Sequence, residues 1–342
     1  MSKTLKNIIS YVLVFGATAF LVWFSLKNIE PPSGKSKLDF ILETWDKADK
    51  FLFILSGLVA VLSHVARAER WRLLLSPIGY KVGLMPAFFS VMGGYFVNLA
   101  IPRGGEVFRC INLFRLNKVP VETSAGTVLV ERLIDVVFLL SFIGAAFLIE
   151  YDKLIEIIFA FLDERKKAQA MVQEGPSYTW IFGLVCVLAA LFVLFWAIKK
   201  GKLQSLLAKV NNIWLNMKMG LLSIFKLEAK FLFLFYSLVI WVLYFLMAWL
   251  CMIAFDETKV LGLEAALTIF TLGSIAMAMP FPGGTGSYHF LVPLGLATLY
   301  GLAKDKALAF TFVFHAWQTL VIIVFGLISL IGSQLAKSNE SN

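Results

Sequence analysis

Long apolar segments alternate with short polar connections along the whole chain. Six uninterrupted apolar runs approach or exceed the roughly 20 residues that a helix needs to cross a bilayer. They cover residues 8–26, 51–66, 126–149, 179–198, 231–255 and 307–335. We therefore predict an all-α polytopic membrane protein with about six full transmembrane helices, the first of them an uncleaved anchor.

Two further apolar regions, 84–118 and 265–302, are broken in the middle by proline and glycine. Irregular backbone inside a membrane is tolerated where it is buried in protein or lines a polar cavity. We interpret both regions as re-entrant helical hairpins, which gives eight or more membrane segments. The alternative, in which each half crosses the membrane fully, stays open.

The charges of the connecting segments predict the orientation. Segments 67–81 and 199–230 have net charges of +3 and +6, whereas 150–178 and 256–264 each have −2 and 27–50 is neutral. Because Lys and Arg concentrate in cytoplasmic loops, we expect the two basic segments and both termini on the cytoplasmic side of the membrane.

The two broken regions would then enter from opposite faces, as in an inverted-topology repeat. The half-repeats cover roughly 51–149 and 231–335 of a single domain, 1–342. Between them, 199–230 reads as a basic amphipathic linker helix on the cytoplasmic lipid surface.

Composition excludes most other classes of protein. Hydrophobic residues make up 59% of the chain, charged residues 15%, and mean hydropathy is +0.82. These values exclude a soluble enzyme and a disordered chain. The net charge of +9 is explained by topology, so we expect no binding of nucleic acid.

The first candidate site lies in the first broken region. Pro102 stops one helix, and Gly104 and Gly105 permit close backbone approach before the next. The free N–H groups at such a helix start attract anions. Arg103, Glu106 and Arg109 share one helical face, and we expect Glu106 to pair with either Arg. The remaining charge would meet a lipid phosphate, although a salt-bridged surface turn is the alternative.

Charged residues also occur where the helix of 126–149 is expected. Glu131, Arg132 and Asp135 need partners inside the membrane. We expect Arg132 to pair with Asp135 and Glu131 to reach Arg103 or Arg109. Both a structural ion-pair network and a role in proton or lipid handling stay open.

The second broken region contains Pro282, Gly283, Gly284 and Gly286, followed by His289. These residues expose backbone and imply a cavity. His289 reads as a hydrogen-bond partner or as a functional group. The spacing of His, Cys, Asp and Glu predicts no metal site, and we expect no cofactor.

Together these motifs resemble those of the lysylphosphatidylglycerol synthase transmembrane family, also called flippase-like integral membrane proteins. The matching residues are Asn98, Pro102, Arg103, Gly105, Glu106, Arg109, Glu131, Arg132, Asp135, Pro282, Gly283, Gly284 and Gly286. Many members carry a Glu where this chain has His289. The resemblance implies a multi-helix protein of the bacterial inner membrane, with Asn98 in its site. In two-part members this region moves aminoacylated phosphatidylglycerol between leaflets. The synthase domain is not seen before the chain ends at Asn342, so we expect no enzymatic aminoacyl transfer.

The resulting hypothesis is a transporter that moves a phosphate-containing lipid, aminoacylated or lipid-linked, between leaflets. Its partners would be membrane lipids. Two alternatives remain: an accessory or scaffold subunit bound to an envelope-biogenesis protein, and, less favoured, a membrane-embedded enzyme that modifies lipids.

Overall fold

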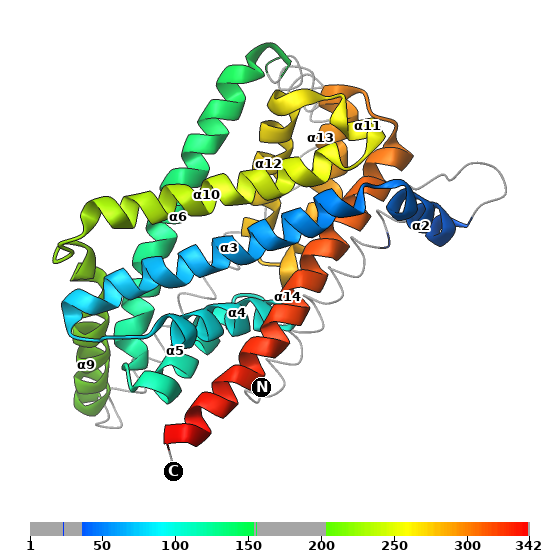
Figure 1. Ribbon diagram of the computed structural model, residues 1–342. Helices are drawn as coiled ribbons and strands as arrows, with labels where there is room; N and C mark the ends of the chain where they lie inside the picture. Colours follow the sequence, from blue (N-terminus) through cyan, green and yellow to red (C-terminus); the bar gives the residue numbers. More distant parts are fainter. Residues whose placement is uncertain (1–22, 24–35, 154, 156–202, 341–342) are drawn as a thin grey trace, which may run out of the picture.

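The computed structural model describes residues 23, 36–153, 155 and 203–340 (Figure 1). All elements in these ranges are helical, which confirms the all-α prediction there. The apolar run 179–198, nearly all of 8–26 and most of segment 150–178 lie outside the described residues, so their predicted roles stay predictions.

Four long helices form the frame: α3 (Lys50–Leu75), α6 (Val121–Ile149), α10 (Lys230–Ile253) and α14 (Lys304–Glu340). Within the described ranges, the spans that are long and apolar enough to cross a membrane are Lys50–Ile78, Val121–Ile149, Lys230–Ile253 and Lys304–Ala336. They match four of the six predicted runs. Helix α3 continues nine residues past the predicted end at residue 66, because Arg67 and Arg70 are buried within the bundle.

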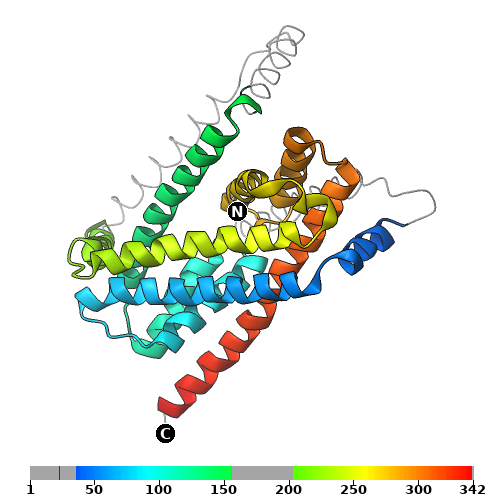
Figure 2. The same cartoon turned by 45° about the horizontal axis from the view of Figure 1, so that its top comes forward.

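Helices α3 and α10 lie side by side and antiparallel (Figure 2). Asp49 N–H at the start of α3 donates to Ala254 O after α10, at 2.9 Å, so these two ends are adjacent. Short helices α2 (Lys37–Lys47) and α11 (Asp256–Lys259) lie at this end. The basic connections, with η1 (Ser76–Ile78) and η2 (Leu222–Ile224), lie at the other. This grouping agrees with the grouping predicted from loop charge.

Each broken region forms a hairpin of two packed helices. Helices α4 (Leu84–Ala100) and α5 (Gly104–Asn117) have 17 and 14 residues. Helices α12 (Gly262–Ala278) and α13 (Ser287–Tyr300) also have 17 and 14, with η3 (Pro282–Gly284) in the turn between them. A 17-residue helix is about 26 Å long, which is shorter than the roughly 30 Å hydrocarbon core.

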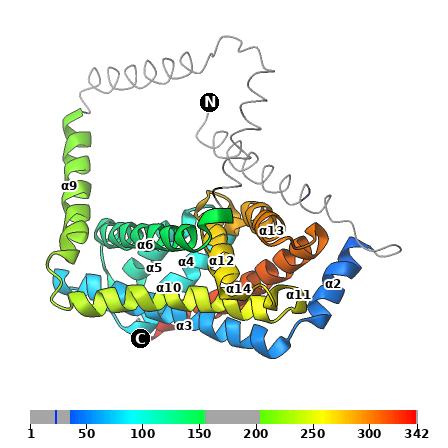
Figure 3. The same cartoon turned by 90° about the horizontal axis from the view of Figure 1, so that it is seen from above.

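Helix α9 (Leu203–Leu221) makes up most of the described part of the predicted amphipathic linker, 199–230, and lies at the edge of the bundle (Figure 3). It packs against α6 through two glycines. A Cβ on Gly220 would lie 2.2 Å from Thr123 O, and one on Gly126 would lie 2.3 Å from Met217 O. This close backbone approach attaches α9 to α6, while Trp214 and Leu215 remain half exposed.

Candidate functional site

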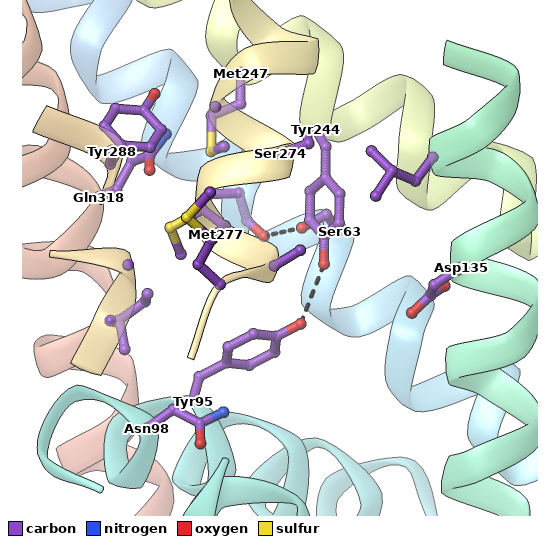
Figure 4. Close-up of a pocket in the computed structure, with 18 of the residues that line it drawn as sticks. Ser63, Tyr95, Asn98, Asp135, Tyr244, Met247, Ser274, Met277, Tyr288 and Gln318 are labelled. Atoms are coloured by element: carbon purple, nitrogen blue, oxygen red, sulfur yellow. Dashed lines mark hydrogen bonds between the residues drawn. The ribbon is translucent and has the colours of Figure 1, made fainter. Parts of the chain in front are cut away.

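The turns of the two hairpins meet inside the frame and border a cavity of about 470 Å³ (Figure 4). Its walls come from α3, α4, α5, α6, α10, α12, α13 and α14 and from both turns. The turns touch directly: a Cβ on Gly283 would lie 3.0 Å from Leu99 Cδ2. Arg103 Nη2 also donates to Ala278 O at the end of α12. Residues nearly 200 positions apart therefore border one space.

The charged side of the cavity begins with two pairs of side chains on facing helices. Arg67 and Arg70 are three residues apart on α3, and Glu131 and Asp135 are four apart on α6, so each pair shares a helical face. Arg67 Nη1 lies 2.9 Å from Asp135 Oδ2, Arg70 Nη2 lies 2.8 Å from Asp135 Oδ1, and Arg70 Nε lies 3.3 Å from Glu131 Oε1. All four residues are buried.

The α4–α5 hairpin adds to this network through α5. Arg109 forms a buried ion pair with Glu131 and lies over the Trp71 ring, 3.8 Å from its centroid. Arg132 Nη2 lies 3.2 Å from Glu106 Oε1, and Arg132 Nη1 lies 3.7 Å from Asp135 Oδ2. The network thus ties α3, α5 and α6 together through ion pairs in which each carboxylate has at least one arginine partner.

Two of the predicted ion pairs form and one does not. Glu131 reaches Arg109, and Arg132 lies near Asp135, as expected. The expected pairing of Glu106 with Arg103 or Arg109 is wrong, because Glu106 pairs with Arg132 on α6. Arg109 is engaged by Glu131 behind the cavity wall and does not line the cavity.

Sequence reasoning missed several members of the site. Arg67 and Arg70 belong to the segment predicted as a basic loop, 67–81, but they lie in the last turns of α3. The available signal was the continuation of the helical pattern past residue 66. Ser63, His64, Tyr95 and Tyr244 also line the cavity. Tyr244 Oη accepts a hydrogen bond from Arg67 Nε at 3.2 Å and lies 3.3 Å from Tyr95 Oη.

The turn between α4 and α5 does not offer all of its N–H groups to a ligand. Gly104 N–H donates to Ile101 O at 2.9 Å, and Gly105 N–H donates to Asn98 Oδ1 at 2.8 Å. The predicted anion site on the first two N–H groups is therefore occupied by the turn itself. Asn98 lines the cavity and uses its oxygen for Gly105, which leaves its Nδ2 donors for the cavity (Figure 4).

The turn between α12 and α13 contributes Pro280, Phe281, Gly283 and Gly284 to the cavity wall. Gly283 and Gly284 have φ of 56° and 70°, a conformation that glycine adopts at little cost. A Cβ on Gly284 would lie 2.2 Å from Met277 Sδ, so the turn packs tightly on the end of α12. Pro282 and Gly286 are in the same turn but do not line the cavity.

His289 lies outside this cavity, in an adjoining hollow lined also by Thr285, Phe312 and His315. Its ring centroid is 4.8 Å from that of His315. His315 Nε2 lies 3.0 Å from Gly283 O and so links α14 to the second turn. His289 is therefore a neighbour of the hairpin turn, separate from the charged wall.

The remaining wall of the cavity is apolar. Its larger side chains are Leu99, Val136, Leu139, Trp241, Met247, Phe270, Met277, Met279, Phe281, Phe314, Val321 and Ile322. Methionine is flexible and adapts to irregular ligands. The cavity is thus amphipathic, with arginines and carboxylates on one side and hydrocarbon on the other.

Several polar atoms in the charged wall are buried without a hydrogen-bond partner: His64 Nδ1, Glu106 Oε2 and Arg132 Nε. Buried polar atoms in native proteins normally have a partner in the protein, in water or in a ligand. All three residues line the cavity. The described ranges contain no group of three His, Cys, Asp or Glu side chains able to hold a metal ion.

These features define a multi-pass helical membrane protein with an amphipathic, positively charged cavity between two broken helix pairs. The chain belongs to the family described as the lysylphosphatidylglycerol synthase TM region, which matches residues 7–326. A UPF0104 membrane protein of Methanocaldococcus jannaschii is 31% identical to it over 108 residues. That match covers 31% of this chain and 32% of the relative, so the chain aligns with about a third of the relative's length. No solved structure matches the chain.

Proposed function

We propose that this protein moves a phosphate-containing lipid between the two leaflets of the bacterial inner membrane. The observation that carries the proposal is the amphipathic cavity at the meeting point of the two hairpin turns. Its arginines suit a phosphate, which the planar guanidinium group binds through two parallel hydrogen bonds. Its apolar wall suits the adjoining acyl or prenyl chain.

In this proposal the two hairpins are re-entrant halves of an inverted repeat, and their turns meet near the middle of the membrane. The equal lengths of corresponding helices support it, with 17 residues in α4 and α12 and 14 in α5 and α13. Transporters with this symmetry place their site where the interrupted helices meet. The end of the bundle that carries both basic connections would face the cytoplasm.

The residues of the site have different proposed roles. Arg67, Arg103 and Arg132 line the cavity and would meet the phosphate. Arg70, Arg109 and Glu131 are fully or almost fully buried and would hold the wall rigid. The glycines of both turns would act as the hinge that changes access from one leaflet to the other.

Glu106 would control release of the lipid, because it competes with the phosphate for Arg132. Glu106→Gln removes that competition while keeping the size of the side chain. We expect lipid movement to slow by about tenfold or more, the factor that about 1.4 kcal/mol of tighter ground-state binding gives. Protein yield and thermal stability should change little, because the Glu106 side chain is partly exposed and Arg132 keeps Asp135.

The measurement uses purified protein in liposomes with headgroup-labelled lipid, and follows the label that becomes accessible from outside. Glu122→Gln is the matched control, since Glu122 lies in the first turn of α6 and does not line the cavity. Movement at the wild-type rate in Glu106→Gln would contradict the assigned role. No movement of any lipid by the folded wild type would favour the scaffold function instead.

A further inference from the structure

The ionic groups in and behind the cavity wall do not cancel. Five guanidinium groups face three carboxylates. The cations are Arg67, Arg70, Arg103, Arg109 and Arg132, and the anions are Glu106, Glu131 and Asp135. The cluster therefore has a net charge of +2, beside a wall of hydrocarbon.

The uncompensated charge is directed at the cavity. Arg70 and Arg109 are engaged with carboxylates behind the wall, and Arg67 with Asp135 and Tyr244. Arg103 donates to the carbonyl oxygen of Ala278 and has no acidic partner among the residues that the structure describes. Arg132 keeps a buried Nε without a partner.

A second observation also points to a ligand at this place. His64 is 94% buried, as its relative exposure is 6%, and it lines the cavity with its Nδ1 lacking a partner. The ring is held between Tyr95 and Tyr244, at centroid distances of 4.5 and 6.4 Å. A buried polar atom without a hydrogen bond destabilises the folded protein unless a ligand or a water molecule bonds to it.

We infer that the cavity binds a phosphate group carrying two negative charges, such as the terminal phosphate of a lipid phosphomonoester, in preference to the single charge of a phosphodiester headgroup. Two charges neutralise the excess of the cluster, whereas a phosphodiester leaves one guanidinium group without an anionic partner. The inference rests on the proposed function and gives its substrate class.

A dianionic phosphate can belong to a lipid or to a free phosphate ion. The apolar wall, with Met247, Met277 and Met279, favours the lipid. Free phosphate would leave that wall without a partner. The lipid is therefore the source to which we commit.

The experiment measures equilibrium binding to the purified full chain in uncharged detergent micelles, with radiolabelled phosphatidic acid as the probe. Unlabelled phosphatidic acid and phosphatidylmethanol compete for it at pH 8. The two lipids differ by one methyl group and one negative charge. We expect phosphatidic acid to compete at an approximately tenfold lower concentration, the factor that one additional charge-assisted hydrogen bond supplies. Equal competition by phosphatidylmethanol would overturn the inference.

Inorganic phosphate is the third competitor and separates the two sources. No competition at millimolar concentration identifies the lipid as the ligand. Competition as effective as that of phosphatidic acid would overturn the assignment to a lipid.

Three variants test the charge count. Arg103→Gln removes one excess charge from an exposed residue and should abolish most of the preference. Glu106→Gln adds an excess charge and should strengthen it. Lys118→Gln removes a charge from an exposed residue that does not line the cavity and should leave it unchanged. A preference that stays the same in all three variants would contradict the count.

This binding assay and the liposome assay fail independently. Selective binding of phosphatidic acid without any lipid movement would support the site and contradict transport. Lipid movement without selectivity between phosphatidic acid and phosphatidylmethanol would support transport and contradict the inference.

Discussion

Arg103 adopts a backbone conformation that is costly for any residue except glycine. Its φ is 60° and its ψ is 5°, immediately before Gly104 and Gly105. A side chain in this left-handed region costs roughly 1–2 kcal/mol, so a third glycine would suit the turn better. The presence of an arginine that lines the cavity is consistent with a side chain kept for its charge.

Arg103→Gly separates the conformational cost of a side chain at this position from the contribution of the arginine charge. We expect the free energy of unfolding to stay within about 1 kcal/mol, because relief of strain offsets the greater freedom of glycine in the unfolded chain. Lipid movement should fall strongly because the guanidinium group is lost. Thermal unfolding in detergent and the liposome assay measure the two effects.

Lys118→Gly provides the comparison, because Lys118 also has a positive φ, of 56°, and is exposed at the end of α5. This variant should keep both stability and transport. Loss of transport in Lys118→Gly, or full transport in Arg103→Gly, would show that the cavity charge is not the reason for the arginine.

At the residue scale, charged residues that interrupt an apolar run could be recognised from the sequence, whereas charged residues at the end of such a run could not. Glu131 and Asp135 stand out because an isolated charge in a membrane helix needs a partner. Arg67 and Arg70 are their partners on α3, but their position at the end of an apolar run made them look like a basic loop. Burial at a helix end depends on neighbouring helices and cannot be seen in the run itself.

The α4–α5 hairpin is held closed by direct backbone contact. A Cβ on Gly105 would lie 2.0 Å from Gly94 O, and one on Gly94 would lie 2.8 Å from Gly105 O. Two helices at this separation cannot accept even a methyl group without moving apart. The glycine pair therefore sets the position of Arg109, one turn along α5, against Glu131 on α6.

Gly105→Ala should open the hairpin and lower stability by at least about 1–3 kcal/mol, the usual cost of overpacking. Thermal unfolding in detergent measures it. Gly144→Ala is the control, since Gly144 lies in α6 with no atom within 4 Å of its Cβ position. It should raise stability by roughly 0.5–1 kcal/mol. Equal effects at the two positions would contradict the close approach.

At the element scale, the hairpins could be predicted because Pro102, Gly104 and Gly105, and Pro282 with its glycines, interrupt apolar runs. The residue that each glycine contacts could not be predicted from the sequence. Gly94 lies inside a regular helical pattern, and its proximity to Gly105 arises only when the hairpin closes. The Asn98 side chain that completes the turn through Gly105 N–H entered the site only through family resemblance.

The whole molecule brings two hairpins from distant parts of the chain to one cavity. The charged wall comes mainly from α3, α5 and α6, and much of the apolar wall from α10, α12 and α14. The sequence predicted that both broken regions border a central site, because irregular backbone in a membrane requires a cavity. It did not predict that His289 would lie in a separate hollow beside His315, since that depends on how α13 packs against α14.

If the lipid passes between the hairpins, their turns must move relative to each other during transport. Leu99 and Gly283 are in contact across the two turns: a Cβ on Gly283 would lie 3.8 Å from Leu99 Cα. This close approach makes a cysteine at each position a suitable pair for a disulfide cross-link between the two turns. The pair is made in a chain whose Cys110, Cys186 and Cys251 are replaced by alanine.

The most direct test measures lipid movement by the Leu99→Cys/Gly283→Cys protein in liposomes, reduced and then oxidised. Each single variant must first show transport and serves as the control for the oxidant. We predict that oxidation stops lipid movement only in the double variant and that reduction restores it. Unchanged movement, with the cross-link complete on a gel, would show that the lipid does not travel through this cavity.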